Sequence, residues 1–300
     1  MIVCPYHGWQ YTGEEGRLGR AVNMKGIEKF APRENSLLAV QVTTLGPLIF
    51  ARCPSPSTPY ISSPPSPYAS SANAAASVTH PVSPSAHSLS HPDKVEDTFA
   101  ATFPQLPALL GDLSTHTFVS RHTYSIKCNW KVFADNYLDG GYHISKLHPG
   151  LASQLSLPSY RSHLYDLFSV QVCDALPAEK RHLAGNEVPE RVGSPVYAWL
   201  FPTTAINKYG SWMDVHTVQP TGPSSCFVTF DYFAQRDFLS GLSPDDLAAQ
   251  IRASCDVQQE DIDICERVQV GLVSDAYSPG RYAAPETPSH HFHTLLAKYI

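Results

Sequence analysis

Between Cys53 and Pro92 the chain contains no Asp, Glu, Lys or Arg, and Ser, Pro and Ala dominate its composition. A stretch of this kind cannot bury enough apolar surface to offset the entropy lost on ordering. We therefore predict a disordered insert over residues 53–97. The insert restricts the chain to two separately folded parts, residues 1–52 and 98–300.

Charge and cysteine content exclude several classes of protein. The chain has 27 acidic and 21 basic residues and a net charge of -6, which argues against a nucleic-acid partner. No run approaches the roughly 18 apolar residues of a membrane span, so no membrane partner is expected. The seven cysteines are scattered, which predicts a reducing, intracellular location, first of all the cytoplasm. The first residues lack the pattern of a signal peptide.

The two parts differ in their expected secondary structure. Residues 1–52 are β-rich, with short strands at 37–42 and 47–50 around a turn at residues 45–47. In the second part we predict a long helix from an N-cap at Ser243 and a Pro244 in its first turn to about residue 270. The other expected elements are a helix at 129–139 and strands at 121–126, 164–172, 196–202, 212–218 and 226–233. The expected fold class is α+β, a small β domain followed by an antiparallel sheet with helices.

One short motif near the start can hold a metal. Cys4 and His7 stand three apart, and Gly8 allows the tight loop that would point sulfur and imidazole at one ion. A Cys-x-x-His pair without further ligands is also compatible with a chance occurrence in the sequence, or with half of a zinc site.

A second motif lies in the segment NWKVFADNYLDGGYHISKLH, residues 129–148. His143 and His148 are five apart, so their rings converge only if the helix breaks, which the flanking Gly and Pro residues favour. Two His and one carboxylate are the ligands of a mononuclear Fe(II) oxygenase, and Asp135 and Asp139 supply acid nearby. Two surface His residues on a broken helix are the simpler alternative.

Together these strings resemble the alpha subunits of Rieske-type non-haem iron oxygenases. CPYHGW (residues 4–9) resembles the second half of the Rieske signature, and residues 129–148 resemble the catalytic iron motif. Further similarity to the choline monooxygenase branch lies at YGSWMD (209–214), QPTGP (219–223) and FDYF (230–233). The resemblance implies a partial Rieske β domain followed by a helix-grip catalytic domain.

The resemblance also implies ligands for two cofactors. Cys4 and His7 would be half of the ligands of a Rieske 2Fe-2S cluster. The other Cys-x-His pair stands upstream in the family and is not in these residues. We therefore expect an N-terminally truncated sequence or a degenerate relative, which also leaves organellar targeting open.

For the mononuclear Fe(II), the resemblance assigns His143 and His148 as ligands. It places the third ligand at Asp261, with Glu260 and Asp263 as neighbouring alternatives. Asp139 would be the acid that hydrogen-bonds a ligand His and couples it to the neighbouring subunit's cluster.

Two further assignments stay open at this point. Many relatives have the bridging acid three residues before the first His, where this chain has Gly140, and Asp139 stands four before, so Asp135 stays the alternative to Asp139. The acidic run around Asp261 is also compatible with a solvated helix face.

The function implied is hydroxylation of choline to betaine aldehyde, with electrons from a ferredoxin or reductase and a homotrimer as the assembly. A quaternary ammonium favours an aromatic pocket, for which we considered Tyr142, Trp212, Tyr232, Tyr277 and Tyr282. The alternatives are oxygenation of another quaternary amine or an aromatic acid, or a non-catalytic remnant without a cluster.

Overall fold

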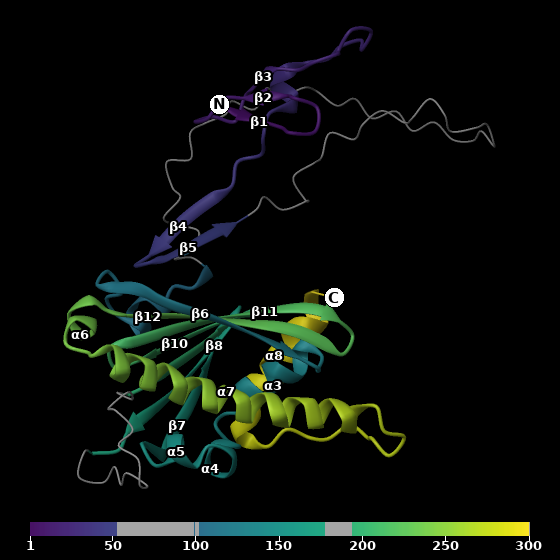
Figure 1. The fold of residues 1–300 in the computed structure, drawn as a ribbon. Helices are drawn as coiled ribbons and strands as arrows, with labels where there is room; N and C mark the ends of the chain where they lie inside the picture. The colour runs from purple at the N-terminus through teal and green to yellow at the C-terminus, as the bar shows by residue number, and fades with distance from the viewer. Residues whose placement is uncertain (53–98, 100–101, 178–193, 300) are drawn as a thin grey trace. The chain divides into compact units, whose positions relative to one another are not determined.

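The computed structural model describes residues 1–52, 99, 102–177 and 194–299 (Figure 1). Within these residues the chain forms two compact units, one of Met1–Thr44 with 49–52 and one of Leu45–Leu48 with 99–299. The predicted insert at 53–97 lies outside the described residues and stays a prediction.

The N-terminal part consists of short antiparallel elements. A three-stranded sheet contains β1 (Ile2–Val3), β2 (Gln10–Tyr11) and β3 (Leu18–Arg20), the 3-10 helix η1 spans Pro32–Asn35, and β4 (Gln41–Leu45) pairs with β5 (Leu48–Arg52). The turn between β4 and β5 is at Gly46, with φ of 57°, as the sequence predicted. The strand predicted from residue 37 was wrong at its start, because the Leu37 N–H donates to Gly16 O (2.8 Å) instead of joining a strand.

The second part is built on a seven-stranded antiparallel sheet, which confirms the α+β prediction. The strand order is β6-β12-β11-β10-β9-β8-β7. The bounds are β6 (His116–Ile126), β7 (Leu155–Leu164), β8 (Phe168–Ala175), β9 (Val196–Leu200), β10 (Thr204–Tyr209), β11 (Trp212–Gly222) and β12 (Ser225–Gln235). Strands β7 to β12 are sequential neighbours, whereas β6 lies beside β12, so β6 and β7 are the two edges of the sheet.

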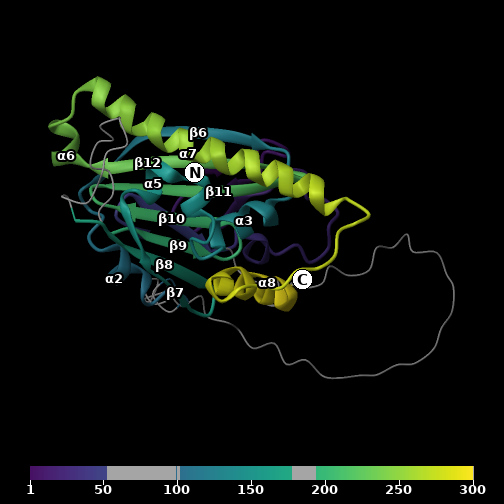
Figure 2. The same ribbon diagram turned by 90° about the horizontal axis from the view of Figure 1, so that it is seen from below.

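Three helices, α3, α7 and α8, lie against one face of this sheet (Figures 1 and 2). The helices are α2 (Leu106–Leu110), α3 (Trp130–Leu138), α4 (Ile144–Leu147), α5 (Pro149–Ala152), α6 (Arg236–Ser240), α7 (Pro244–Leu272), 3-10 helix η3 (Ala284–Glu286) and α8 (Thr287–Tyr299). The segment α3–α4–α5 connects the two edge strands. Residues between β6 and β7 therefore cross the covered face. No helix among the described residues is long and apolar enough to span a membrane.

The two predicted helices form where their caps are. The Asn129 side chain accepts the Lys131 N–H (3.0 Å) at the start of α3. The Ser243 side chain accepts the Asp246 N–H (3.1 Å) at the start of α7. Such caps satisfy backbone donors that have no partner inside the helix.

The strand predicted at residues 164–172 was wrong in its first residues, which form a turn, whereas residues 168–172 belong to β8. The Tyr165 N–H donates to Phe168 O (2.9 Å), and the two rings stack with centroids 4.3 Å apart. The chain thus turns between β7 and β8, although the residues there are apolar enough to continue a strand. Strand β10 and most of β7 were not predicted.

Phe292 of α8 lies in the core between the helices and the sheet. It is 2% exposed and meets Trp130 of α3 and Trp199 of β9 edge-on, at centroid distances of 5.6 and 5.9 Å. This aromatic contact fixes the position of α3, which leads into the candidate site.

Candidate metal centre

The loop after α3 has a shape that requires glycine. Gly140 and Gly141 have φ of 74° and 75°, where a residue with a Cβ is strained. A Cβ on Gly141 would also lie 2.7 Å from the ring of Tyr160. The helix is broken here, and the one-turn helix α4 follows with His143 before it and His148 after it. The break predicted from the sequence is confirmed, and it lets two imidazoles five residues apart converge.

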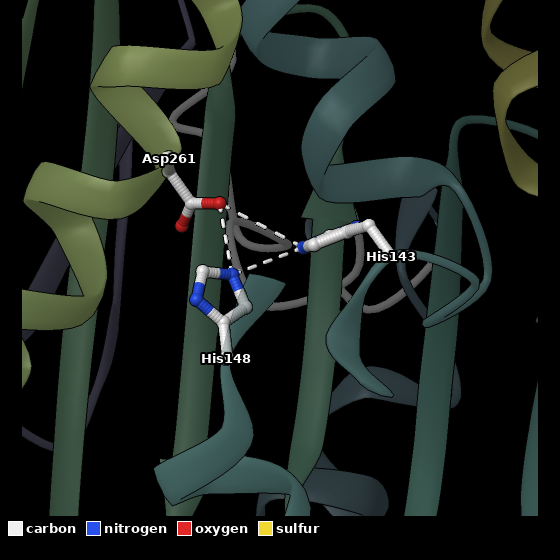
Figure 3. A group of neighbouring side chains, drawn as sticks. All are labelled: His143, His148 and Asp261. Atoms are coloured by element: carbon white, nitrogen blue, oxygen red, sulfur yellow. Dashed lines mark hydrogen bonds and ion pairs between the residues drawn. The ribbon is translucent and has the colours of Figure 1, made fainter. Parts of the chain in front are cut away.

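Three side chains meet at one point on the covered face (Figure 3). His143 Nε2 and His148 Nε2 are 3.2 Å apart, and Asp261 Oδ1 of α7 is 3.0 Å from His148 Nε2 and 3.7 Å from His143 Nε2. The three ligand atoms lie within 4.8 Å of one another. Two imidazole nitrogens and one carboxylate oxygen are the donor set of non-haem Fe(II) oxygenases, so these residues fit such an ion.

Each imidazole is oriented by a carboxylate on its other nitrogen. Asp139 Oδ2 is 2.6 Å from His143 Nδ1, and Glu260 Oε2 is 2.6 Å from His148 Nδ1. Bonds of this kind direct Nε2 toward a metal and make it more basic. Glu260, the alternative third ligand, is therefore the partner of a histidine.

Asp139 is itself held firmly. It accepts the backbone N–H groups of Gly141, Tyr142 and His143 at 2.9, 3.1 and 2.9 Å. These bonds fold the glycine loop around the carboxylate, and they place Asp139 beside the ring that it orients.

The charges around His148 control its protonation in the absence of metal. Burial lowers the pKa of His148, but the hydrogen bonds and charges of Asp261 and then Glu260 outweigh burial, so the net shift is upward. A metal ion must displace that proton, because only the neutral ring is a ligand.

Two acids considered from the sequence lie elsewhere. Asp135 binds His293 of α8, with 2.8 and 3.0 Å from Nε2 to its two oxygens. Asp263 is exposed and accepts from Gln259 Nε2 (2.9 Å) along α7. None of the contacts described for either acid reaches His143 or His148.

A cavity of about 340 Å³ opens beside the three side chains. Aromatic residues line it, namely Phe133, Tyr137, Tyr160, Tyr197, Tyr209 and Phe230. Burial raises the pKa of Tyr137 and of Tyr160, so both phenols stay neutral. An aromatic wall of this size suits a small cation.

None of the five aromatic residues considered from the sequence lines this cavity. Trp212 and Tyr232 are core residues. Trp212 donates a hydrogen bond to Gln250, and Tyr232 donates one to Ser254. The other three, Tyr142, Tyr277 and Tyr282, are exposed. Tyr209 and Phe230 stand inside sequence strings that the resemblance singled out. Their side chains line the cavity because of the register of the sheet. The sequence alone does not give this register, so it could not identify the two residues as part of the cavity wall.

The Cys4–His7 motif forms a tight turn. Gly8 N–H donates to Cys4 O (2.9 Å), Cys4 N–H donates to Trp9 O (2.8 Å), and Gly8 has φ of 72°. The backbone N–H groups of His7 and then Tyr6 lower the pKa of the Cys4 thiol. A Rieske cluster needs two Cys and two His, and in the described part of the chain only the group at Asp261 combines three possible metal ligands. The described residues therefore do not fit a complete cluster.

Comparison with known proteins places this geometry in a family. The family profile described as "Ring hydroxylating alpha subunit (catalytic domain)" matches residues 113–300. A chloroplastic choline monooxygenase of Arabidopsis thaliana is 35% identical, over 98% of this chain and 62% of that protein. The choline monooxygenase of Spinacia oleracea is 30% identical over 100% and 59%, and a carnitine monooxygenase oxygenase subunit of Acinetobacter baumannii is 23% identical over 92% and 64%. The chain thus spans about three fifths of the length of these relatives.

Among solved structures, the quaternary ammonium Rieske monooxygenase CntA has a TM-score of 0.65 at 21% identity, covering 99% of this chain and 71% of that one. This similarity concerns the fold. The profile covers well over half of the chain and includes all three side chains of the candidate metal centre. The chain therefore belongs to the ring-hydroxylating alpha subunit family, the Rieske-type non-haem iron oxygenases.

Proposed function

We propose that this chain carries the oxygenase site of an enzyme that hydroxylates a small quaternary amine, with choline as the substrate. The observation that carries the proposal is the joining of a two-His, one-carboxylate donor set to an aromatic cavity. Fe(II) bound there would supply dioxygen activation.

Charge favours choline over carboxylated amines and aromatic acids. Five acids line the cavity (Asp139, Asp214, Asp256, Glu260 and Asp261), and the described lining contains neither Lys nor Arg. A carboxylate in the substrate would meet these acids and no basic side chain of the described lining, so a bound Fe(II) would be its one cationic partner there, whereas a trimethylammonium group would be attracted by the acids. Relatives named choline monooxygenase support this preference, and the carnitine monooxygenase subunit at lower identity represents the alternative substrate class.

The protein's own residues have distinct tasks in the proposed reaction. His143, His148 and Asp261 would hold the ion, and Asp139 and Glu260 keep the imidazoles oriented. The aromatic walls would hold the cation and exclude water. The overall change converts R–CH2OH, O2, two electrons and two protons into R–CH(OH)2 and water, and the aldehyde hydrate is betaine aldehyde in its hydrated form.

The two electrons must come from outside this site. We propose a ferredoxin or a reductase as donor and a homotrimer as the assembly. A solved structure of CntA is described in terms of inter-subunit electron transfer, and the same route would let another subunit serve this iron site. The plant relatives are named as chloroplastic, so we include a plastid beside the cytoplasm as a location for this chain.

The first test is metal binding by the full chain, reconstituted with Fe(II) without oxygen. We expect about one iron per chain, and its loss in the His143→Ala, His148→Ala double variant. His163→Ala, at an exposed histidine of β7, is the matched control and should leave iron content unchanged. Iron content that does not change in the double variant would contradict the proposed ligands.

The second test is product formation. A chain extended upstream to carry all four cluster ligands is assayed with ferredoxin, its reductase and choline, and betaine aldehyde is the expected product. The remnant alternative gains if such a chain reduces its cluster and yet oxidises no quaternary amine.

A further inference from the structure

Asp214 is a buried acid in the wall of the cavity. It is 2% exposed and lines the cavity from β11. Its Oδ1 accepts from Asn207 Nδ2 (2.8 Å) and lies 2.5 Å from His216 Nε2, and its Oδ2 accepts from the Tyr209 hydroxyl. Three donors around one carboxylate stabilise its ionised form.

The neighbouring His216 contacts this carboxylate through only one of its two ring nitrogens. His216 is 5% exposed, and its Nδ1 has no hydrogen-bond partner among the described residues. A protonated ring would bury that N–H without an acceptor, which is costly. The ring therefore meets the carboxylate through Nε2, and this nitrogen also lies 3.2 Å from Asn207 Nδ2, so Asp214, Asn207 and His216 form one polar cluster.

The carboxylate is connected to three aromatic rings of the same cavity. Tyr209 donates to it directly, and Tyr137 donates to Asn207 Oδ1 (2.6 Å), whose amide nitrogen donates to Asp214. Phe230 stacks on His216, with centroids 3.4 Å apart and an angle of 11°. A phenol that donates to a carboxylate gains electron density in its ring, and this density attracts a cation on the ring face.

We propose that Asp214 determines the charge preference of the cavity, acting through Tyr209 and Tyr137 as a positioning residue for a cationic substrate. The negative charge of the Asp214 carboxylate and the higher electron density of the two phenol rings would favour a trimethylammonium group over an uncharged group of the same shape. This inference rests on the proposed function, since it concerns the substrate of the same site.

The experiment compares two ligands of equal shape. Choline and dimethylbutanol, its uncharged isostere with carbon in place of nitrogen, are titrated calorimetrically into the full, metal-loaded chain. We expect the native chain to prefer choline, and Asp214→Asn to reduce that preference by about tenfold while binding of the isostere remains. A loss of structure alone would weaken both ligands equally.

Two further variants sharpen the test. Tyr209→Phe keeps the ring and removes its bond to Asp214, so part of the preference should be lost. Asp237→Asn is the matched control, because Asp237 is an exposed acid of α6 that does not line the cavity. It should leave the ratio of the two affinities unchanged.

The outcomes separate this inference from the proposed function. If the native chain binds neither ligand, the proposed function fails. If it prefers choline and the preference survives in Asp214→Asn, only the inference is overturned. Should Asp214→Asn not fold, Tyr209→Phe decides, and an unchanged affinity ratio in that variant overturns the inference.

Discussion

Gly140 lies against the carbonyl oxygen of Pro285, so closely that a Cβ on Gly140 would stand 1.9 Å from that oxygen. Pro285 belongs to η3, just before α8, whereas Gly140 follows α3. The contact joins two segments far apart in the sequence. It leaves the loop from Asp139 to His143 little room for another shape.

Gly140→Ala should therefore disturb the metal centre. The new Cβ cannot avoid a backbone oxygen by a side-chain rotation, and the positive φ adds a cost of about 1 kcal/mol. We expect weaker Fe(II) binding together with a lower free energy of unfolding. Gly150→Ala is the control, because a Cβ there meets nothing within 4 Å. Equal iron affinity in the two variants would contradict a fixed loop.

Asp139→Asn and Glu260→Gln form a matched pair, since each acid orients one histidine. Each should weaken iron binding by about 10- to 100-fold, the usual effect of losing such a partner. They should differ in turnover per bound iron, measured in a chain with a complete cluster. Asp139→Asn should lose turnover if Asp139 couples the iron to the electron donor, whereas Glu260→Gln should retain it. Similar turnover in both would argue against that role.

Phe292→Ala should be severely destabilising. The side chain is 2% exposed and contacts Trp130, Trp199 and Phe201, and removing such a ring costs about 3–5 kcal/mol. Urea denaturation measures the change. Phe227→Ala, at a ring that is 41% exposed, should cost about 1 kcal/mol or less. A small effect at Phe292 would mean that the core collapses around the missing ring.

Because His116 is buried, we predict that the free energy of unfolding falls in acid. It is 3% exposed, neither ring nitrogen has a partner among the described residues, and burial followed by the charge of Lys208 lowers its pKa. The unfolded chain takes up this proton near pH 6.5, so stability is present above that pH and falls as the pH drops toward the folded pKa.

The measurement for His116 is urea denaturation at about pH 8 and about pH 5.5. His116→Leu should lose less stability between the two values than the native chain. His163→Gln, at an exposed position, should behave like the native chain. A pH dependence that is the same in all three proteins would exclude His116 as the cause.

The sequence predicted those elements whose signals are local. The caps at Asn129 and Ser243 and the glycine pair before His143 act within a few residues, and the structure has the helices and the break where these signals stand. The turn at Tyr165 was missed because its stabilising contact with Phe168 joins two apolar residues that also suit a strand.

The candidate site was only partly predictable, because it depends on distant contacts. Asp261 could be proposed from a resemblance, but no local pattern brings α7 to the loop that carries His148. The cavity wall depends on the register of β10, β11 and β12, which pairs Asn207 with Asp214 and His216 with Phe230. Sequence periodicity gives the two faces of a strand but does not give these partners.

The separation of His148 and Asp261 by 113 positions in the sequence gives the candidate metal centre a second consequence. An ion held by both would tie α7 to the segment between β6 and β7, and whatever binds only the folded chain stabilises it in proportion to the logarithm of its free concentration. Iron supply would then set the lifetime of the protein as well as its chemistry. In an iron-poor cell the chain would open more often and be degraded sooner, so its abundance would fall before any change in its synthesis.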